Sequence, residues 1–416
     1  MAHVDLARAR PSAPFVPLAG MRRCARMVAV ALVAVCAAPD IGRAQKPAEG
    51  FQSTAPHAIL IEADSGSVLF EKAADQLIYP ASLAKLMTAE LVFHEITEGR
   101  LDPETEFVIS ENAWRRGGAP SGGSTMFAAL HSRVKVRDLI RGVIVQSGND
   151  ACIALAEGMA GNEPAFAEMM NKRAREIGLT KSNFTDASGL HDPNLQVTTR
   201  ELAKLAQYII RTYPEYYKIF NEREFTWNKI RQQNRNPLLP LNIGADGLKT
   251  GFTKEAGYGI VGSAVQSGLR LIVVVNGMKT AKDRADEARK LLEWGFRGFE
   301  SRMLFAEGET VGEAKLFGGA KGRVALSGGD RPIRLLVPRG VSEKIVARIV
   351  YTGPVPAPVE QGQAIGRLKV WRGENVVLEV PLQAAESVGR GNLPQRAFDA
   401  VSELVVGLFR AGASRL

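Results

Sequence analysis

The segment YPASLAKLMTA, residues 79–89, places a serine and a lysine one helical turn apart, directly after a proline. Serine is a favoured residue at helix starts, so Ser82 and Lys85 alone do not distinguish a helix cap from a nucleophile with a base beside it. The same spacing recurs at Ser132 and Lys135 in HSRVKV. A catalytic interpretation therefore depends on further polar groups elsewhere in the chain.

Two later segments supply such groups. VQSGNDA contains Ser147 and Asn149, which we expect on the same side of a tight turn after a helix. DGLKTGF contains Lys249, Thr250 and Gly251 at the start of an alternating strand, where the glycine permits close approach of another backbone. Each segment alone also fits an ordinary turn or strand start.

The three motifs together are far more specific than any one of them. Ser-x-x-Lys, Ser-x-Asn and Lys-Thr-Gly follow in this order at Ser82, Ser147 and Lys249. The competing Ser132 lies only fifteen residues before Ser147, which leaves no room for the intervening fold. Ser82 also stands at a helix start, where backbone N–H groups favour a developing anion. Ser82 is therefore the predicted nucleophile.

These motifs resemble those of the low-molecular-mass penicillin-binding proteins, and more narrowly the D-alanyl-D-alanine carboxypeptidases of the penicillin-binding protein 5 group. SGGSTMF, VRDLIRGVIVQSGNDACIALAE, NRN and LLEWGFRGFE add to the likeness, which runs from about residue 50 to the C-terminus. The resemblance implies removal of the terminal D-alanine from peptidoglycan pentapeptide stems, and acylation by β-lactams. It implies no metal and no cofactor.

The resemblance also implies a role for each motif residue. A neutral Lys85 takes the proton from Ser82, which attacks the peptide carbonyl. The oxyanion lies between the backbone N–H groups of Ser82 and Phe252. Ser147 relays the proton to the departing D-alanine, and Asn149 holds the substrate amide.

The substrate carboxylate needs cationic partners. The resemblance assigns Lys249 and Thr250 to it, beside Gly251. Lys279, in VNGMKT, stands where an arginine is expected, and lysine lacks the bidentate fork of a guanidinium. Arg235, in NRN, is a further candidate at the site.

Hydrophobic patterning predicts an α+β fold. An antiparallel hairpin is expected over 57–72 and a buried strand over 269–279. Helical periodicity covers 136–148, 200–213 and 286–300. An antiparallel sheet with a helical cluster is the natural combination, of the kind found in penicillin-binding proteins and β-lactamases.

Composition shifts divide the chain into four parts. Residues 1–44 read as an export signal, with 1–20 as an alternative upstream start before Met21. Residues 45–302 form the expected catalytic domain. Short β-rich runs over 303–388 predict a small all-β sandwich domain. Residues 391–416 predict an amphipathic helix.

The first 44 residues also account for much of the chain's basic character. They hold six arginines and two aspartates, followed by the apolar run MVAVALVAVCAA at 27–38. The remainder is only mildly basic and contains no long Lys/Arg run, which argues against nucleic-acid binding. Two of the three cysteines lie in the signal, so Cys152 has no internal partner and is expected to be a small buried hydrophobe.

The tail carries an apolar stripe at helical spacing, formed by Phe398, Val401, Leu404, Val405, Leu408 and Phe409. Such a stripe either docks on its own domain or lies in a membrane interface. Together with the export signal, it predicts a peripheral enzyme on the periplasmic side of the cytoplasmic membrane.

Three alternatives share these features. The motifs fit a D,D-endopeptidase or a β-lactamase of the same fold, although the chain lacks the Glu-x-x-Leu-Asn segment of one lactamase class. A catalytically silent wall-binding or shape-organising protein is the non-enzyme alternative. It fits less well, because unused buried charges are costly to keep.

Overall fold

The computed structural model describes residues 2–4, 51–340, 345–372 and 375–397. The chain divides into two compact units, and the division falls after Arg302. The first unit comprises residues 48–302 together with 334–339, and the second holds most of the later strands. In the part of the chain so described, no helix is both long and apolar enough to cross a membrane.

The first unit is built on an antiparallel sheet with strand order β3-β2-β10-β9-β8 among the described residues. Its strands are β2 (His57–Glu62), β3 (Val68–Lys72), β8 (Ala245–Thr253), β9 (Gly257–Gln266) and β10 (Leu269–Met278). The expected hairpin and the expected buried strand are thus confirmed. β8, which carries the Lys-Thr-Gly motif, is the edge strand.

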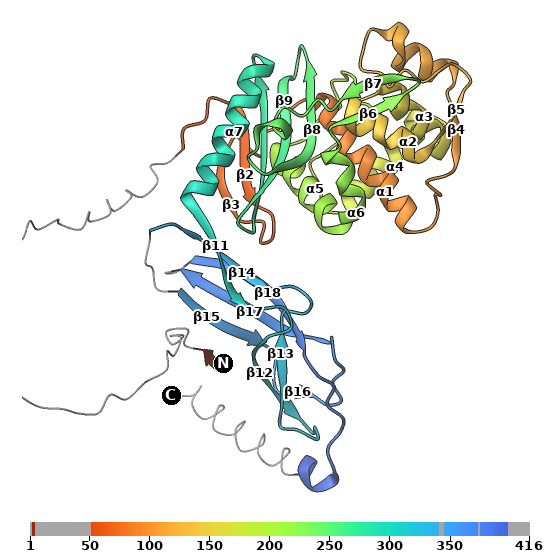
Figure 1. The fold of residues 1–416 in the computed structure, drawn as a ribbon. Helices are drawn as coiled ribbons and strands as arrows, with labels where there is room; N and C mark the ends of the chain where they lie inside the picture. The colour runs from red at the N-terminus through yellow and green to blue at the C-terminus, as the bar shows by residue number, and fades with distance from the viewer. Residues whose placement is uncertain (1, 5–50, 341–344, 373–374, 398–416) are drawn as a thin grey trace, which may run out of the picture. The chain divides into compact units, whose positions relative to one another are not determined.

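Both faces of this sheet are covered, because its central strand is apolar on both sides. Alternate residues of β10 enter two different cores, with Ile272 and Val274 on one face and Leu271 and Val273 on the other. Helix α7 (Ala281–Gly298) covers one face, and the helical cluster of this unit lies on the other side (Figure 1). The chain therefore buries large apolar areas on each face, which stabilises the sheet.

Helix α7 is longer than the sequence pattern indicated. It begins at Ala281 instead of 286, because the Thr280 side chain accepts a 3.0 Å hydrogen bond from the backbone N–H of Asp283. This N-cap lies outside the apolar periodicity from which the helix was predicted. The helix ends at Gly298, and Phe299 begins β11 (Phe299–Phe305).

The helical cluster surrounds α1 (Lys85–Thr97), which follows the short 3-10 helix η1 (Ala81–Ala84). Its other members are α2 (Val136–Arg141), α3 (Asn149–Ala160), α4 (Glu163–Glu176), α5 (Thr199–Thr212) and α6 (Pro214–Tyr217). Shorter turns are η2 (Ala113–Gly117), η3 (Ala119–Ser121), η4 (Gly142–Gln146), η5 (Lys218–Asn221) and η6 (Leu239–Leu241). Small two-stranded ribbons are β4 (Glu106–Val108) with β5 (Arg133–Lys135), and β6 (Glu224–Trp227) with β7 (Ile230–Gln233).

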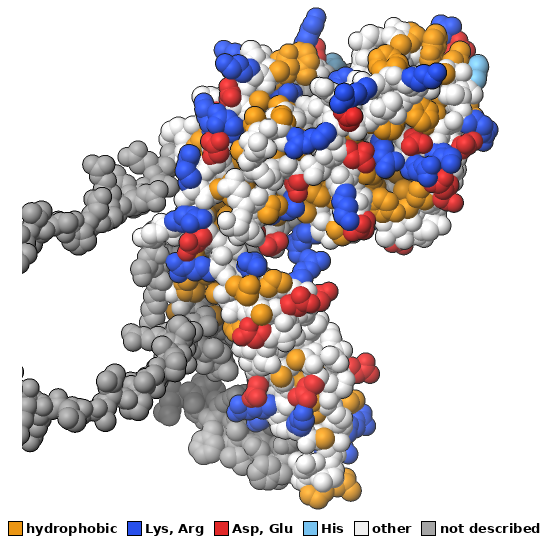
Figure 2. All heavy atoms as spheres, in the orientation of Figure 1, with side chains coloured by type: hydrophobic (Ala, Val, Ile, Leu, Met, Phe, Trp, Pro, Cys, Tyr) orange, Lys and Arg blue, Asp and Glu red, His pale blue; other side chains and the backbone are white. Residues whose placement is uncertain are grey.

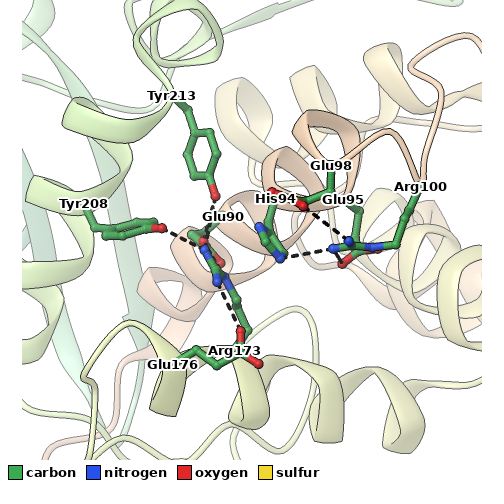
Figure 3. A network of polar contacts seen from close by, with 9 residues as sticks. All are labelled: Glu90, His94, Glu95, Glu98, Arg100, Arg173, Glu176, Tyr208 and Tyr213. Carbon is green, nitrogen blue, oxygen red and sulfur yellow. Dashed lines mark hydrogen bonds and ion pairs between the residues drawn. The ribbon is translucent and has the colours of Figure 1, made fainter. Parts of the chain in front are cut away.

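A buried ion pair fixes α1 within this cluster (Figure 3). Oε1 of Glu90, on α1, lies 3.0 Å from Nε of Arg173 on α4, and the Tyr213 hydroxyl donates to the same oxygen at 3.1 Å. Burial raises the pKa of Glu90, and the neighbouring Arg173 opposes that rise. The pair ties together three segments that are far apart in the sequence.

The described part of the second unit consists mainly of β-strands. Its strands are β12 (Thr310–Phe317), β13 (Arg323–Ser327), β15 (Ile345–Tyr351), β16 (Val355–Pro356), β17 (Ala364–Arg372) and β18 (Asn375–Ala384). They pair, with β1 (Ala2–Val4) at one edge, in the order β1-β15-β17-β18-β13-β12-β16. β14 (Ile333–Pro338) pairs with β11.

The surface is charged with both signs. On the face drawn in Figure 2, Lys and Arg side chains are interspersed with Asp and Glu. Residues 393–397 are helical, but the apolar stripe of the predicted tail lies outside the described residues, as does most of the predicted export signal.

Candidate active site

The fold brings the three motifs into one cluster. Nζ of Lys85 lies 2.9 Å from Oγ of Ser82 and 2.8 Å from Oδ1 of Asn149. Nζ of Lys249 lies 2.9 Å from Oγ of Ser147. Side-chain hydrogen bonds therefore connect the Ser-x-Asn segment to each of the other two motifs.

Ser82 lies in η1, at the point where the chain enters α1. Pro80 precedes this turn as its N-cap, and Ser82 is partly exposed while its neighbours are buried. Strand β8 passes directly beside the turn. A Cβ added to Gly251 would lie 2.9 Å from the Pro80 carbonyl oxygen and 3.1 Å from the Leu83 nitrogen. The glycine is thus required for contact with the serine turn itself, and not only for the approach of a substrate.

Lys85 is almost completely withdrawn from water, with 1% of its surface exposed. Besides Ser82 and Asn149, its third partner is the backbone carbonyl oxygen of Ser188. Burial is the largest influence on this ammonium and lowers the pKa of Lys85, against the opposing effect of the Asp186 carboxylate. The arrangement favours the neutral amine that a general base requires.

Ser147 occupies a left-handed backbone conformation with φ 64°, at the end of η4 and two residues before α3. This turn aims its hydroxyl at Lys249 and places Asn149 on the side of Lys85. Burial, followed by the charges of Lys85 and Arg235, holds the pKa of Lys249 well below its ordinary range. The two lysines thus face two different serines.

Arg235 also lies at the cluster. Its backbone N–H donates to the Val145 carbonyl at 3.3 Å, and its guanidinium donates to Ser124 Oγ at 2.5 Å. Ser124 in turn accepts, through its carbonyl, a 2.8 Å hydrogen bond from the Asn149 backbone. Arg235 is therefore connected to the Ser-x-Asn turn from the β7 side.

The structure does not bring Lys279 into this cluster. Its side chain is exposed and lines a separate recess with Thr54, Pro56 and Asp283. The arginine that reaches the site is Arg284, five residues further along and one turn into α7. The expectation for Lys279 comes from the family resemblance, in which VNGMKT supplies the cation, whereas here a residue of the following helix turns inward.

Arg284 has the features of a ligand-binding cation. Only 9% of it is exposed, and its Nε has no protein partner among the described residues. Its guanidinium lies over the ring of Tyr258, 5.7 Å from the centroid. Tyr258 is stacked on Phe252, the residue after Lys-Thr-Gly, with ring centroids 4.0 Å apart. The charge of Arg284 also contributes to the lowered pKa of Lys249.

The two remaining nucleophile candidates are structural. Cys152 is fully buried, and burial raises the pKa of its thiol to about 12, so it stays neutral. Ser132 donates to the Ala129 carbonyl at 2.6 Å, and Lys135 pairs with Glu104 at the surface. Over the described residues, no group of three His, Cys, Asp or Glu side chains could hold a metal ion.

An α+β domain with this serine–lysine site, joined to an all-β domain, defines a serine hydrolase of the penicillin-binding class. More narrowly, the chain belongs to the D-alanyl-D-alanine carboxypeptidase family. The family model with that description matches residues 42–280, and the model for the C-terminal domain of penicillin-binding protein 5 matches residues 299–390. The resemblance inferred from the motifs is thereby confirmed, as is the α+β fold with its all-β second domain.

Individual relatives agree with this assignment. The chain is 40% identical to the D-alanyl-D-alanine carboxypeptidase DacA of Haemophilus influenzae, over 86% of this chain and 91% of the relative. It is 39% identical to DacC of Escherichia coli, over 88% and 92%. The crystal structure of penicillin-binding protein 5 from H. influenzae superposes with a TM-score of 0.73 at 40% identity, over 82% of this chain and 98% of that one.

Proposed function

We propose that this protein removes the terminal D-alanine from peptidoglycan stems ending in D-Ala-D-Ala, through an acyl-enzyme on Ser82. The observation that carries the proposal is the contact of Ser82 Oγ with a buried Lys85 Nζ at 2.9 Å. The family gives the reaction class. The geometry of the site supports the role proposed for each residue.

The three partners of Lys85 suit a neutral amine. Two of them, the Ser188 carbonyl and the Asn149 Oδ1, can only accept, so they take the two N–H groups. The nitrogen lone pair is then left for the third partner, the Ser82 hydroxyl. Lys85 takes the Ser82 proton as Oγ attacks the carbonyl carbon of the scissile peptide.

The negative charge that develops on the carbonyl oxygen needs donors. The backbone N–H groups of Ser82 and Phe252 are the proposed pair, since β8 runs so close to the serine turn at Gly251 that an added Cβ would lie 2.9 Å from the Pro80 carbonyl oxygen. The exposed side chain of Phe252 is not needed for this role, because only its N–H donates.

Collapse of the tetrahedral intermediate breaks the C–N bond. The departing nitrogen takes the proton that Lys85 removed from Ser82, relayed through Ser147, whose Oγ lies 2.9 Å from Lys249 Nζ. Lys85 is neutral again after this transfer. D-Alanine leaves, and water attacks the ester carbon while giving a proton to Lys85. Lys85 returns this proton to Ser82 Oγ as the ester C–O bond breaks and the acid product forms. The side-chain nitrogen of Asn149 holds the substrate amide, since its oxygen already binds Lys85.

We assign the substrate carboxylate to Arg284 and Thr250, with Lys249 behind them, in place of Lys279. The guanidinium of Arg284 is buried and its Nε has no partner among the described residues, so it can form a bidentate pair with a carboxylate. Such a charge-assisted pair contributes more binding free energy in a buried site than at the surface. A bound carboxylate would also raise the pKa of Lys249 and favour its charged form.

We further propose that β-lactams acylate Ser82, because they present a strained amide beside a carboxylate. The structure of penicillin-binding protein D2 from Listeria monocytogenes is known in an ampicillin-bound form. It superposes on 60% of this chain with a TM-score of 0.52 at 31% identity. Labelled penicillin tests the proposal and separates it from the lactamase alternative. We expect a long-lived covalent adduct together with release of D-alanine from a pentapeptide, whereas rapid turnover of the penicillin would favour a β-lactamase.

The proposed location is the outer face of the cytoplasmic membrane. The arginine cluster and apolar run of residues 1–44 support export, and the apolar stripe of residues 398–409 supports a peripheral helix in the membrane interface. Fractionation of cells producing the full chain tests this. Recovery with the cytosol would contradict both parts.

A further inference from the structure

Asp186 lies behind Lys85, in the loop that joins α4 to α5. Its Oδ1 accepts hydrogen bonds from the backbone N–H groups of Ser188 at 2.6 Å and Gly189 at 2.8 Å. The Ser188 hydroxyl donates to the same oxygen at 2.7 Å, and the Leu190 N–H lies at 3.4 Å. One carboxylate oxygen thus organises the turn from residue 188 to residue 190.

This turn contacts both members of the serine–lysine pair. The Ser188 carbonyl oxygen is one of the three partners of Lys85. The next residue, Gly189, has φ +78°, and a Cβ there would lie 2.0 Å from the Ala81 carbonyl oxygen, directly before Ser82. The turn therefore has little freedom to move without displacing the lysine acceptor or the serine.

We propose that Asp186 is a positioning residue for the general base: it holds the Ser188 carbonyl against Lys85 and supplies the negative charge that accompanies the ammonium formed during acylation. This inference rests on the proposed function of Ser82 and Lys85. It adds a residue that lies outside the three motifs and that does not touch the substrate.

The charge of Asp186 matters because two cations lie near Lys85 and the other nearby carboxylate is bonded elsewhere. Lys249 on β8 and Arg235 disfavour its charged form. On α3, Cys152 is neutral, and Asp150 is engaged by Thr125 Oγ1 at 2.6 Å and by the backbone of 126 and 128. With Cys152 neutral, Asp186 is the anion that acts most strongly on Lys85, and it is connected to Lys85 through the Ser188 carbonyl. As Lys85 gains the serine proton, the Ser188 carbonyl and Asp186 stabilise the new charge.

The test compares Asp186→Asn and Asp186→Ala with wild type, measuring the rate of penicillin acylation as a function of pH. Asparagine keeps an Oδ1 acceptor for the turn but removes the charge. We expect its plateau rate to stay within about threefold of wild type, while the acidic limb moves to lower pH by roughly 0.5–1 unit, because loss of an anion makes Lys85 easier to deprotonate. Alanine removes the acceptor as well, and we expect a loss of roughly 10- to 100-fold in rate, of the size seen when outer-shell partners are removed.

Asp192 provides the matched control in the same loop. Its Oδ1 accepts from the Asn194 backbone at 2.7 Å, away from Lys85. Asp192→Asn removes a charge of the same sign, and we expect neither the plateau rate nor the limb to change.

The outcomes separate the two levels of inference. The role of Asp186 is refuted if wild type is acylated but the acidic limb of the pH–rate profile does not move in Asp186→Asn. It is also refuted if Asp192→Asn moves that limb by the same amount. An Asp186→Ala variant that acylates at the wild-type rate refutes it too. If Asp186→Ala does not fold, the Asp186→Asn profile decides alone. A wild-type protein that forms no adduct refutes the proposed function instead.

Discussion

The ammonium nitrogen of Lys249 lies 2.9 Å from the hydroxyl oxygen of Ser147, as close as Lys85 lies to Ser82. The site therefore contains two lysine–serine pairs that share one buried volume. Because two ammonium groups in such a volume repel each other and lose hydration, burial and mutual charge both lower the pKa of Lys249. One pair can activate the nucleophile while the other passes a proton to the leaving group.

The first prediction concerns the identity of the nucleophile. Ser82→Ala should abolish both the penicillin adduct and the release of D-alanine from a pentapeptide, because no other hydroxyl contacts Lys85 among the described residues. Ser132→Ala removes the serine of the competing motif, which only donates to a surface carbonyl, and should leave both activities intact. Mass spectrometry of the adduct and an assay for free D-alanine measure the result. The reverse pattern would show that Ser132, and not Ser82, is the nucleophile.

The second prediction distinguishes Arg284 from Lys279. Arg284→Lys should lower kcat/KM for the peptide by roughly 10- to 100-fold, since a charge-assisted hydrogen bond contributes about 1.5–3 kcal/mol and lysine loses the planar fork. Lys279→Ala should change kcat/KM less than threefold, because its side chain lies at the surface in a separate recess. Steady-state kinetics on a D-Ala-D-Ala peptide provide the comparison. A large loss in the Lys279 variant alone would restore the assignment made from sequence.

The third prediction is the pH dependence of acylation. Lys85 must be neutral to accept the proton, and burial lowers its pKa, so the rate should increase with pH and reach its plateau below the ordinary lysine pKa of about 10.4. Below the lowered pKa the ammonium form dominates and acylation fails. Stopped-flow measurement with a fluorescent penicillin gives the profile. A rate that increases only near pH 10 would show that burial does not control this lysine.

The fourth prediction concerns stability. Glu90→Ala leaves Arg173 without its buried partner and should reduce the free energy of unfolding by about 3 kcal/mol. Glu95→Ala, one turn further along α1, removes a surface pair with Arg100 and should have a much smaller effect (Figure 3). Denaturant unfolding measures both, and the rate of penicillin acylation shows whether the folded fraction retains its site. Equal losses of unfolding free energy in the two variants would mean that the buried pair stabilises the fold no more than the surface pair does.

The fifth prediction concerns the tail. Removal of residues 398–416 should release the mature protein from membranes and leave peptide hydrolysis intact. The truncation point keeps Gly391, whose N–H donates to the Gly318 carbonyl at 2.9 Å, within the all-β unit. Six large apolar side chains, each contributing roughly 1.5–3 kcal/mol when buried, suffice for reversible binding at an interface. If the truncated protein still sediments with membranes, the stripe serves another purpose.

The reaction class could be predicted from sequence because its motifs are local. Ser82 and Lys85 lie one helical turn apart, and Ser147 and Asn149 lie in one turn, so covalent spacing alone brings each pair together. The buried strand 269–278 could be predicted for a similar reason, since a continuous apolar run can only lie between two covered faces.

Tertiary structure decided what depends on packing between distant segments. Arg284 enters the site because the Thr280 cap starts α7 early and turns that residue inward, whereas Lys279, nearer the strand, remains outside. Asp186 reaches Lys85 only through a turn that lies about one hundred residues away in the chain. Neither relationship can be recognised from hydrophobic periodicity or motif spacing in the sequence. Burial and hydrogen-bond partners are fixed only when the core has assembled.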